Sequence, residues 1–172
     1  MSTEKLNTEE LFVSLANTTY ELLELISSVD EKSINSVPFK DSWTAAQLVS
    51  HVTKSNNSIV QALNTPGKPA ERNPGEGMQE LKAMFLNFNT KLKSPGFILP
   101  TRDTYQKETL IANLKKSIEQ VKDTGNKVNL SEIISVPVFG EITKLELLHF
   151  VLYHTQRHIH QLKKILHSME NK

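Results

Sequence analysis

The fold is decided by residues 143–166, which read TKLELLHFVLYHTQRHIHQLKKIL. On an α-helix each residue turns by about 100°, so residues four apart lie on the same face. One face of this predicted helix is apolar except for two histidines and a glutamine, and it consists of Leu147, Phe150, Val151, His154, His158, Gln161, Leu162 and Ile165. We therefore expect two imidazole rings inside a buried stripe, where a polar ring needs a partner.

His154 and His158 are four residues apart, a spacing at which two histidines of one helix can bind the same metal ion. A histidine on an apolar face is more often a hydrogen-bonded core residue, so the pair alone leaves a metal site and a core role equally open. A zinc-protease helix is excluded, because Thr155 stands where that motif has its catalytic glutamate. A metal would also need a third ligand from another part of the chain.

The other histidines of this segment, His149, His160 and His167, lie together with Tyr153 on a different stripe of the helix. We expect a solvated or half-buried flank there, and we assign it no chemistry. His51 is the remaining histidine of the chain and is therefore the candidate third ligand.

His51 belongs to a second predicted helix that begins in the sequence DSWTAAQL, residues 41–48. Thr44 and Gln47 form the pattern of a capping box, and Trp43 with Leu48 forms the pattern of a hydrophobic staple. The buried face then runs through Leu48, His51, Val52, Ser55, Ile59 and Leu63. Three histidines on the inner faces of two helices form a constellation, and facing helices are where bundles build their metal sites.

The rest of the chain reads as further helices of a single domain spanning residues 1–172, an all-α fold with little sheet at most. A first helix is predicted over about 8–29, with a capping box of Asn7 and Glu10. Residues 65–77 are rich in proline and glycine and predict a long crossover, followed by a helix at about 76–93. A further helix is predicted from about 104 to 123, and 129–140 is expected to be irregular and apolar.

Composition limits the function. Net charge is +1 without a dense run of Lys and Arg, so we expect no nucleic-acid partner. The polar N-terminal residues and the lack of a long apolar run predict a cytoplasmic protein without a membrane partner. There is no cysteine, so metal ligands must be nitrogen or oxygen, and a thiol could take part only if a cofactor or substrate brings it.

Two motifs together give the chain a family resemblance. One is Ser42-Trp43-Thr44-Ala45-x-x-Leu48-x-x-His51, and the other runs from Pro137-Val-Phe-Gly140-x-x-Thr143-x-x-Glu146 to His154-x-x-Arg157-His158-x-x-Gln161-Leu162. In these motifs the chain resembles the DinB/YfiT superfamily over nearly its full length. The resemblance implies a four-helix bundle with up-down-down-up topology, with the helix at 76–93 as an accessory to the crossover. It also implies a divalent metal held by His51, His154 and His158.

Three imidazoles leave one position open, which is the catalytic rather than the structural pattern for zinc. A metal there would lower the pKa of a bound water or thiol. Imidazole ligands suit zinc, nickel, iron and copper, so the sequence does not choose the ion, and zinc and nickel are our first candidates. Each ligand histidine needs an acceptor for its other N–H, and the candidates are Gln161, Gln47, Ser50 and Ser55, although each taken singly is more often an ordinary flank residue.

Three functions remain open. The resemblance implies first a metal-dependent enzyme of the thiol-dependent S-transferase type, which uses a low-molecular-weight thiol such as bacillithiol, mycothiol or glutathione on a small electrophile. The second is a metal-dependent hydrolase, and the third a non-catalytic metal-bound stress or binding protein. A role in nucleic-acid damage is suggested by the family's name alone and disagrees with the near-neutral charge. We expect a small-molecule substrate that enters beside loops 65–77 and 94–103, and a homodimer through exposed helix faces is consistent with such bundles.

Overall fold

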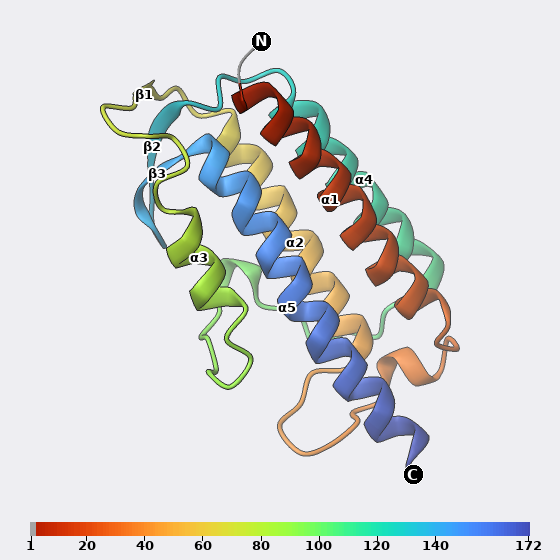
Figure 1. The fold of residues 1–172 in the computed structure, drawn as a ribbon. Coiled ribbons are helices and arrows are strands. Elements are labelled where there is room, and N and C mark those ends of the chain that lie inside the picture. The colour runs from red at the N-terminus through yellow and green to blue at the C-terminus, as the bar shows by residue number, and fades with distance from the viewer. Residues whose placement is uncertain (1–2) are drawn as a thin grey trace.

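The protein is a four-helix bundle, seen from the side in Figure 1. The computed structural model describes the backbone of residues 3–172 and the side chains of residues 8–172. The bundle helices are α1 (Thr3–Ser27), α2 (Ala45–Leu63), α4 (Lys107–Gly125) and α5 (Lys144–Glu170). α2 and α4 run in one direction while α1 and α5 run in the other, which is the expected up-down-down-up topology.

The crossover from α2 to α4 carries the accessory helix α3 (Met78–Phe85), which packs against α5. A short 3-10 helix, η2 (Gly96–Ile98), follows it and contacts α2. Another, η1 (Ser33–Asn35), lies in the connection between α1 and α2. The helix predicted at 76–93 is therefore present but much shorter, because the chain leaves the helical path after Phe85.

A small antiparallel sheet covers the end of the bundle where α5 begins (Figure 1). Its order is β1 (Lys68–Pro69), β2 (Glu132–Val136) and β3 (Gly140–Thr143). The expectation of an irregular segment at 129–140 was wrong, since β2 and β3 form a hairpin with Ile134 opposite Ile142. Gly140 adopts a φ of +66°, a conformation that favours glycine, at the start of β3.

Two capping boxes fix where α2 and α5 begin, the helices that carry His51, His154 and His158. The side chain of Thr44 accepts the backbone N–H of Gln47 at α2, and Thr143 does the same for Glu146 at α5, with the reciprocal bonds also present. The cap at Thr44 was predicted from sequence, and the motif Thr143-x-x-Glu146 has the same spacing. The start of α1 was not predicted, because the helix begins at Thr3 and passes through Asn7 without a break.

The core consists of two apolar clusters along the bundle. On α5 the first cluster ends at Tyr153 and the second begins at Ile159, so His154 and His158 lie between them. Large apolar side chains such as Leu15, Leu22, Leu48 and Leu162 are fully buried, and each contributes roughly 1.5–3 kcal/mol. The described helices include none that is both long enough and apolar enough to cross a membrane.

Candidate metal centre

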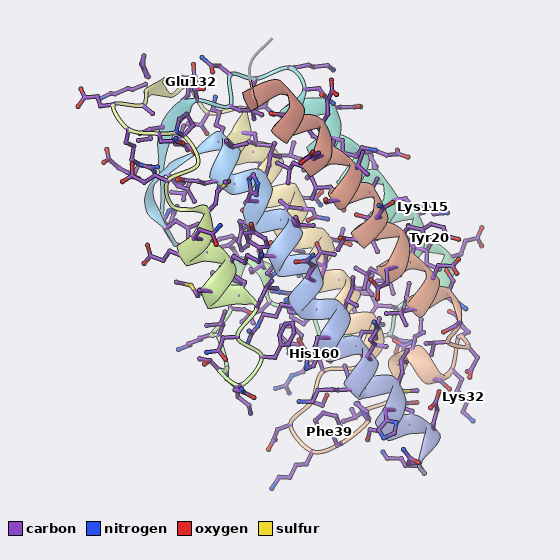
Figure 2. All side chains as sticks on the ribbon, viewed as in Figure 1. Tyr20, Lys32, Phe39, Lys115, Glu132 and His160 are labelled. Atoms are coloured by element: carbon purple, nitrogen blue, oxygen red, sulfur yellow. The ribbon has the colours of Figure 1, made fainter. Side chains whose placement is uncertain are left out.

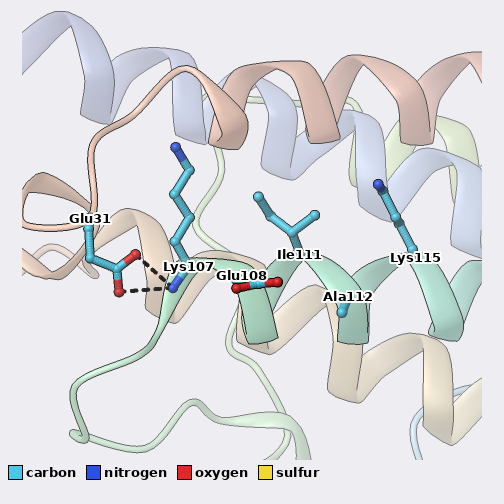
Figure 3. A pocket seen from close by; sticks show the side chains of 6 residues that line it. All are labelled: Glu31, Lys107, Glu108, Ile111, Ala112 and Lys115. Atoms are coloured by element: carbon cyan, nitrogen blue, oxygen red, sulfur yellow. Dashed lines mark hydrogen bonds between the residues drawn. The ribbon is translucent and has the colours of Figure 1, made fainter.

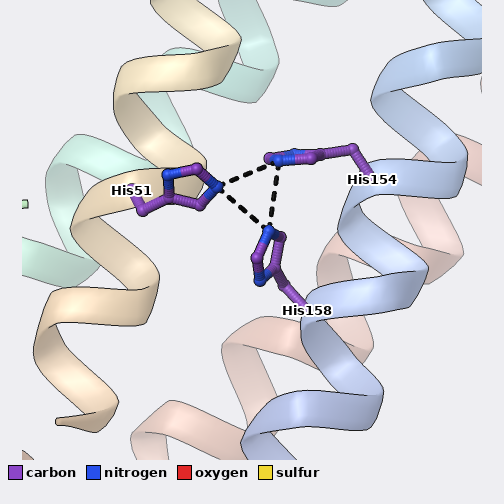
Figure 4. Close-up of side chains that lie close together, drawn as sticks. All are labelled: His51, His154 and His158. Atoms are coloured by element: carbon purple, nitrogen blue, oxygen red, sulfur yellow. Dashed lines mark hydrogen bonds between the residues drawn. The ribbon is translucent and has the colours of Figure 1, made fainter. Parts of the chain in front are cut away.

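Three histidine side chains meet between α2 and α5. Figure 4 shows the ring of His51 reaching from α2 toward His154 and His158 on α5. The Nε2 atom of His51 lies 3.0 Å from the Nε2 atoms of both other rings, and those two atoms are 3.1 Å apart. The three nitrogens thus form a nearly equilateral triangle, and we call these residues the histidine triad. The structure brings together the three histidines that the sequence singled out.

Hydrogen bonds on the far side of two rings fix their tautomers. The Nδ1–H of His51 donates to the carbonyl oxygen of Ile98 at 2.9 Å, and the Nδ1–H of His158 donates to Oε1 of Gln161 at 2.9 Å. In both neutral rings the Nε2 atom therefore carries a lone pair, and both lone pairs point at the centre of the triangle. One N–H on His154 could satisfy only one of them at a time, whereas a cation at the centre would satisfy all three.

Burial keeps these rings neutral, which is the form that binds metal. The exposed fractions are 1% for His51, 5% for His154 and 6% for His158. Burial, reinforced by the neighbouring imidazoles, holds the pKa of His154 well below its usual value. Burial likewise lowers the pKa of His158 to about 3 and lowers that of His51.

The triangle matches the requirements of a divalent ion. Ligand atoms about 2.05 Å from a tetrahedral ion lie roughly 3.3 Å from one another. The separations of 3.0–3.1 Å in the triad are slightly shorter than this value, so small ring movements would accommodate an ion. In the described part of the chain, the metal-ligand group contains these three histidines and no carboxylate. A tetrahedral ion held by these three nitrogens would have a fourth position for another molecule.

Aromatic rings surround the triad and limit its contact with water. The Trp43 ring lies 4.9 Å from that of His51 and stacks at 6.4 Å on that of His158, measured between centroids. On the other side, Phe150 lies 5.0 Å from His154. The staple pattern predicted that Trp43 packs at the start of α2 but did not predict this contact, because Trp43 precedes the helix and helical spacing does not place its ring.

The crossover runs past the triad and is tied to α2 through its backbone. Beside the bond from His51 to Ile98, Nζ of Lys54 donates to the Leu99 carbonyl at 2.8 Å and Nε2 of Gln47 donates to the Thr101 carbonyl at 3.1 Å. We call residues 98–101 the strap. A strap held by three side chains of α2 keeps the His51 ring in one orientation.

Arg157, next to His158 on α5, holds the other part of the crossover. Its guanidinium donates to the carbonyl oxygens of Phe85, Asn87 and Thr90, where α3 ends. A cation at a helix C-terminus satisfies carbonyls that have no partner within the helix. The two ligand-bearing helices therefore fix both ends of the segment that passes the triad.

The remaining predicted site residues have different positions. Gln161 accepts a hydrogen bond from His158, while the side chain of Gln47 bonds to Thr44 in the capping box and to Thr101 of the strap, and among the described contacts it bonds to no histidine. Ser50 and Ser55 are buried, and among the described contacts neither hydroxyl bonds to the triad. His149 and His160 are half-buried and His167 is exposed, as expected. His160, labelled on α5 in Figure 2, stacks on Phe88 with 4.0 Å between ring centroids.

Two hollows lie on the described surface. Figure 3 shows one of about 480 Å³ between the end of α1 and the start of α4. There the carboxylate of Glu31 accepts the backbone N–H of Lys107, and Nζ of Lys107 donates to the Ser27 carbonyl at 2.6 Å. This hollow therefore belongs to the contact between α4 and the end of α1. The second, of about 560 Å³, has Trp43, Gln47 and Leu99 in its wall and thus borders the triad.

Comparison with known proteins decides the family. The family model of the DinB superfamily matches residues 14–162, which include all three histidines of the triad. The chain belongs to the DinB superfamily. This DinB-superfamily protein is 26% identical over 159 residues to the uncharacterized protein YuaE of Bacillus subtilis (strain 168), covering 86% of this chain and 91% of YuaE.

The fold has a solved counterpart. The structure titled "Crystal structure of TT2238, a four-helix bundle protein" matches with a TM-score of 0.60 and 18% sequence identity. The match covers 91% of this chain and 98% of that chain. At this identity the likeness shows the fold alone, and the chemistry must be argued from the site.

Proposed function

We propose that this protein is a metal-dependent enzyme that binds a divalent ion through His51, His154 and His158 and transfers a thiol to a small electrophile. The observation that carries the proposal is the convergence of three Nε2 atoms within 3.0–3.1 Å of one another in a buried, carboxylate-free site. Both zinc and nickel suit three imidazole ligands, and we propose one of the two as the resident ion.

The ion, when bound, would lower the pKa of a thiol or water in its open position and so provide a nucleophile at neutral pH. The residues of the chain would do the rest. The Ile98 carbonyl orients the ring of His51, and Gln161 orients the ring of His158, because each accepts the Nδ1–H of that ring. Acceptors of this kind also raise the basicity of the ligand nitrogen. Trp43 and Phe150 exclude bulk water from the triad, which strengthens electrostatic interactions inside it.

The thiol must come from outside, because the chain has no cysteine. We therefore propose a low-molecular-weight thiol such as bacillithiol, mycothiol or glutathione as co-substrate. Hydrolysis by an activated water is the second candidate, because the same open position suits water. A non-catalytic metal-bound protein is the third, and a protein side chain completing the coordination would favour it.

One experiment ranks these candidates. The metal-loaded protein is incubated with a chromogenic electrophile and each of the three thiols, and separately with chromogenic ester and amide substrates. Thiol-dependent turnover that disappears in His154→Ala, but persists in His160→Ala, would support transfer. Ester or amide cleavage without thiol dependence would favour hydrolysis. Loss of all turnover despite bound metal would leave the non-catalytic role.

A further inference from the structure

The hollow beside the triad has a rigid frame. Its walls are the connection leading into α2, from residue 35 to 47, and residues 99–104 of the crossover. Gln47 joins the two walls by its bond to Thr101. Asn35 joins them again, because its side chain both donates to the Tyr105 carbonyl at 2.9 Å and accepts the Tyr105 backbone N–H at 2.8 Å. The hollow is therefore formed before any ligand arrives, as small-molecule sites usually are.

Charges of both signs line this hollow without being paired. Arg102 supplies a guanidinium, and Asp41 and Asp103 supply carboxylates. All three are exposed, and none is among the ion pairs formed by the described residues. Asp41 also has a φ of 62°, which makes it the one non-glycine residue with a positive φ in the described chain. Strain of this kind is retained where the surrounding structure requires it.

Exposed apolar side chains line the same hollow. Val37 is 60% exposed and Leu99 is 45% exposed, although both are large apolar side chains. Trp43 also lines the hollow, and its ring lies 4.9 Å from the ring of His51. A molecule in contact with Trp43 would thus touch a side chain that packs on the triad.

We infer that this hollow binds a small zwitterionic molecule with an apolar group, of which an amino acid or a dipeptide is the simplest form. Its carboxylate pairs with Arg102, its ammonium faces Asp41 and Asp103, and its apolar part packs on Trp43 and Leu99. A guanidinium suits a carboxylate because it can donate two parallel hydrogen bonds. The further role of this molecule as substrate or co-substrate rests on the proposed function, whereas its binding does not.

The chain contains a built-in reporter for the test, because Trp43 is its only tryptophan. Fluorescence excited at a wavelength selective for tryptophan is titrated with glycyl-L-phenylalanine, with its N-acetyl derivative, which lacks the ammonium, and with its amide, which lacks the carboxylate. We expect saturable binding of the dipeptide and about tenfold weaker binding of each derivative, since one charge-assisted bond is lost each time.

Variants of the hollow test which charged group of the dipeptide each side chain pairs with. Arg102→Gln should weaken the dipeptide about tenfold but leave the affinity of the dipeptide amide unchanged, which is the signature of a direct pairing. Asp41→Asn should weaken the dipeptide but not the N-acetyl derivative, and asparagine also tolerates the positive φ at that position. Lys93→Gln removes an exposed charge outside the hollow and should change nothing.

Equal affinity for all three probes, no saturable fluorescence change with the dipeptide, or an unaltered affinity in Arg102→Gln would each overturn the inference. The titrations are run on metal-free and zinc-loaded protein, so that the two proposals fail separately. Dipeptide binding in a protein that takes up no zinc would contradict the proposed function and support the hollow as a binding site. Zinc uptake without dipeptide binding would contradict the inference alone.

Discussion

The start and the middle of α5 hold two buried polar clusters that differ in how their hydrogen bonds are satisfied. Near its start, each carboxylate oxygen of Glu146 accepts two hydrogen bonds, one from Arg72 and one from the backbone N–H of Gly77 or Thr143. Two turns later, the Nε2 lone pairs of His51 and His158 point at each other and at His154. A cluster that is complete within the protein is explained by stability, whereas one that lacks donors points to a ligand.

The largest expected effect concerns the triad. Adding zinc to the metal-free protein at about a thousand times its dissociation constant should stabilise the fold by roughly 4 kcal/mol, because the ion binds the folded state. For a chain of this size that corresponds to a rise in Tm of about 10 °C, measured by calorimetry. His154→Ala should show no zinc-dependent shift, while His160→Ala, on the same helix, should keep the full shift. An equal zinc shift in His154→Ala would mean that the triad is not the binding site.

The second-largest expected effect concerns stability and the cluster around Glu146. Glu146→Gln removes the charge that pairs with Arg72 and should lower the free energy of unfolding by about 3 kcal/mol, measured by urea denaturation. Zinc affinity should stay the same, because the triad shares no bond with Glu146. A large loss of zinc affinity in this variant would break the distinction between the two clusters.

A smaller effect is expected from the bond behind one ligand. Gln161→Leu removes the acceptor of the His158 Nδ1–H and should weaken zinc binding about 10- to 100-fold, measured by competition with a chromogenic chelator. Gln156→Leu is the matched control, because its buried Oε1 has no hydrogen-bond partner among the described residues, so zinc affinity should not change. Similar affinities in both variants would show that Gln161 does not support the site.

The smallest effect is the pH dependence of the Glu146 cluster. Burial alone would raise the pKa of Glu146, but hydrogen bonds from Arg72, Thr143 and Gly77 outweigh it, so the pKa lies below its usual value of 4.5. The stability that this carboxylate contributes is therefore present above pH 4.5 and is lost as pH falls through the folded-state pKa. The difference in unfolding free energy between wild type and Glu146→Gln should be constant from pH 7 to about 5 and should shrink below 4.5. A difference that does not change with pH would show that the charge of Glu146 is not the stabilising feature.

Local sequence signals predicted the ligand-bearing helices well. The caps at Thr44 and Thr143 depend on residues three positions away, and helical spacing alone placed His51, His154 and His158 on inner faces. Gln161 was found for the same reason, since it lies three residues from His158 on the same helix.

Contacts between distant segments were not predictable in this way. The acceptor for His51 is the backbone carbonyl of Ile98, which has no side-chain signature and lies 47 residues away. Likewise, α3 ends at Phe85 although the apolar spacing continues, and the carbonyls at this end bond to Arg157, 72 residues from Phe85. The hairpin at 132–143 was missed because its alternating pattern is short and is interrupted by Pro137.

The metal content of the protein tests most directly whether the histidine triad is a metal site. Elemental mass spectrometry is applied to wild type, His51→Ala, His154→Ala and His158→Ala, purified without a nickel column or chelator and then offered zinc, nickel, manganese and iron in turn. We expect close to one equivalent of a divalent metal in the wild type and little in each of these variants. The metal content of His149→Ala and His167→Ala should equal that of the wild type. A well-folded wild type that takes up none of the four metals would contradict the proposed metal site, and the triad would then be a cluster of core histidines.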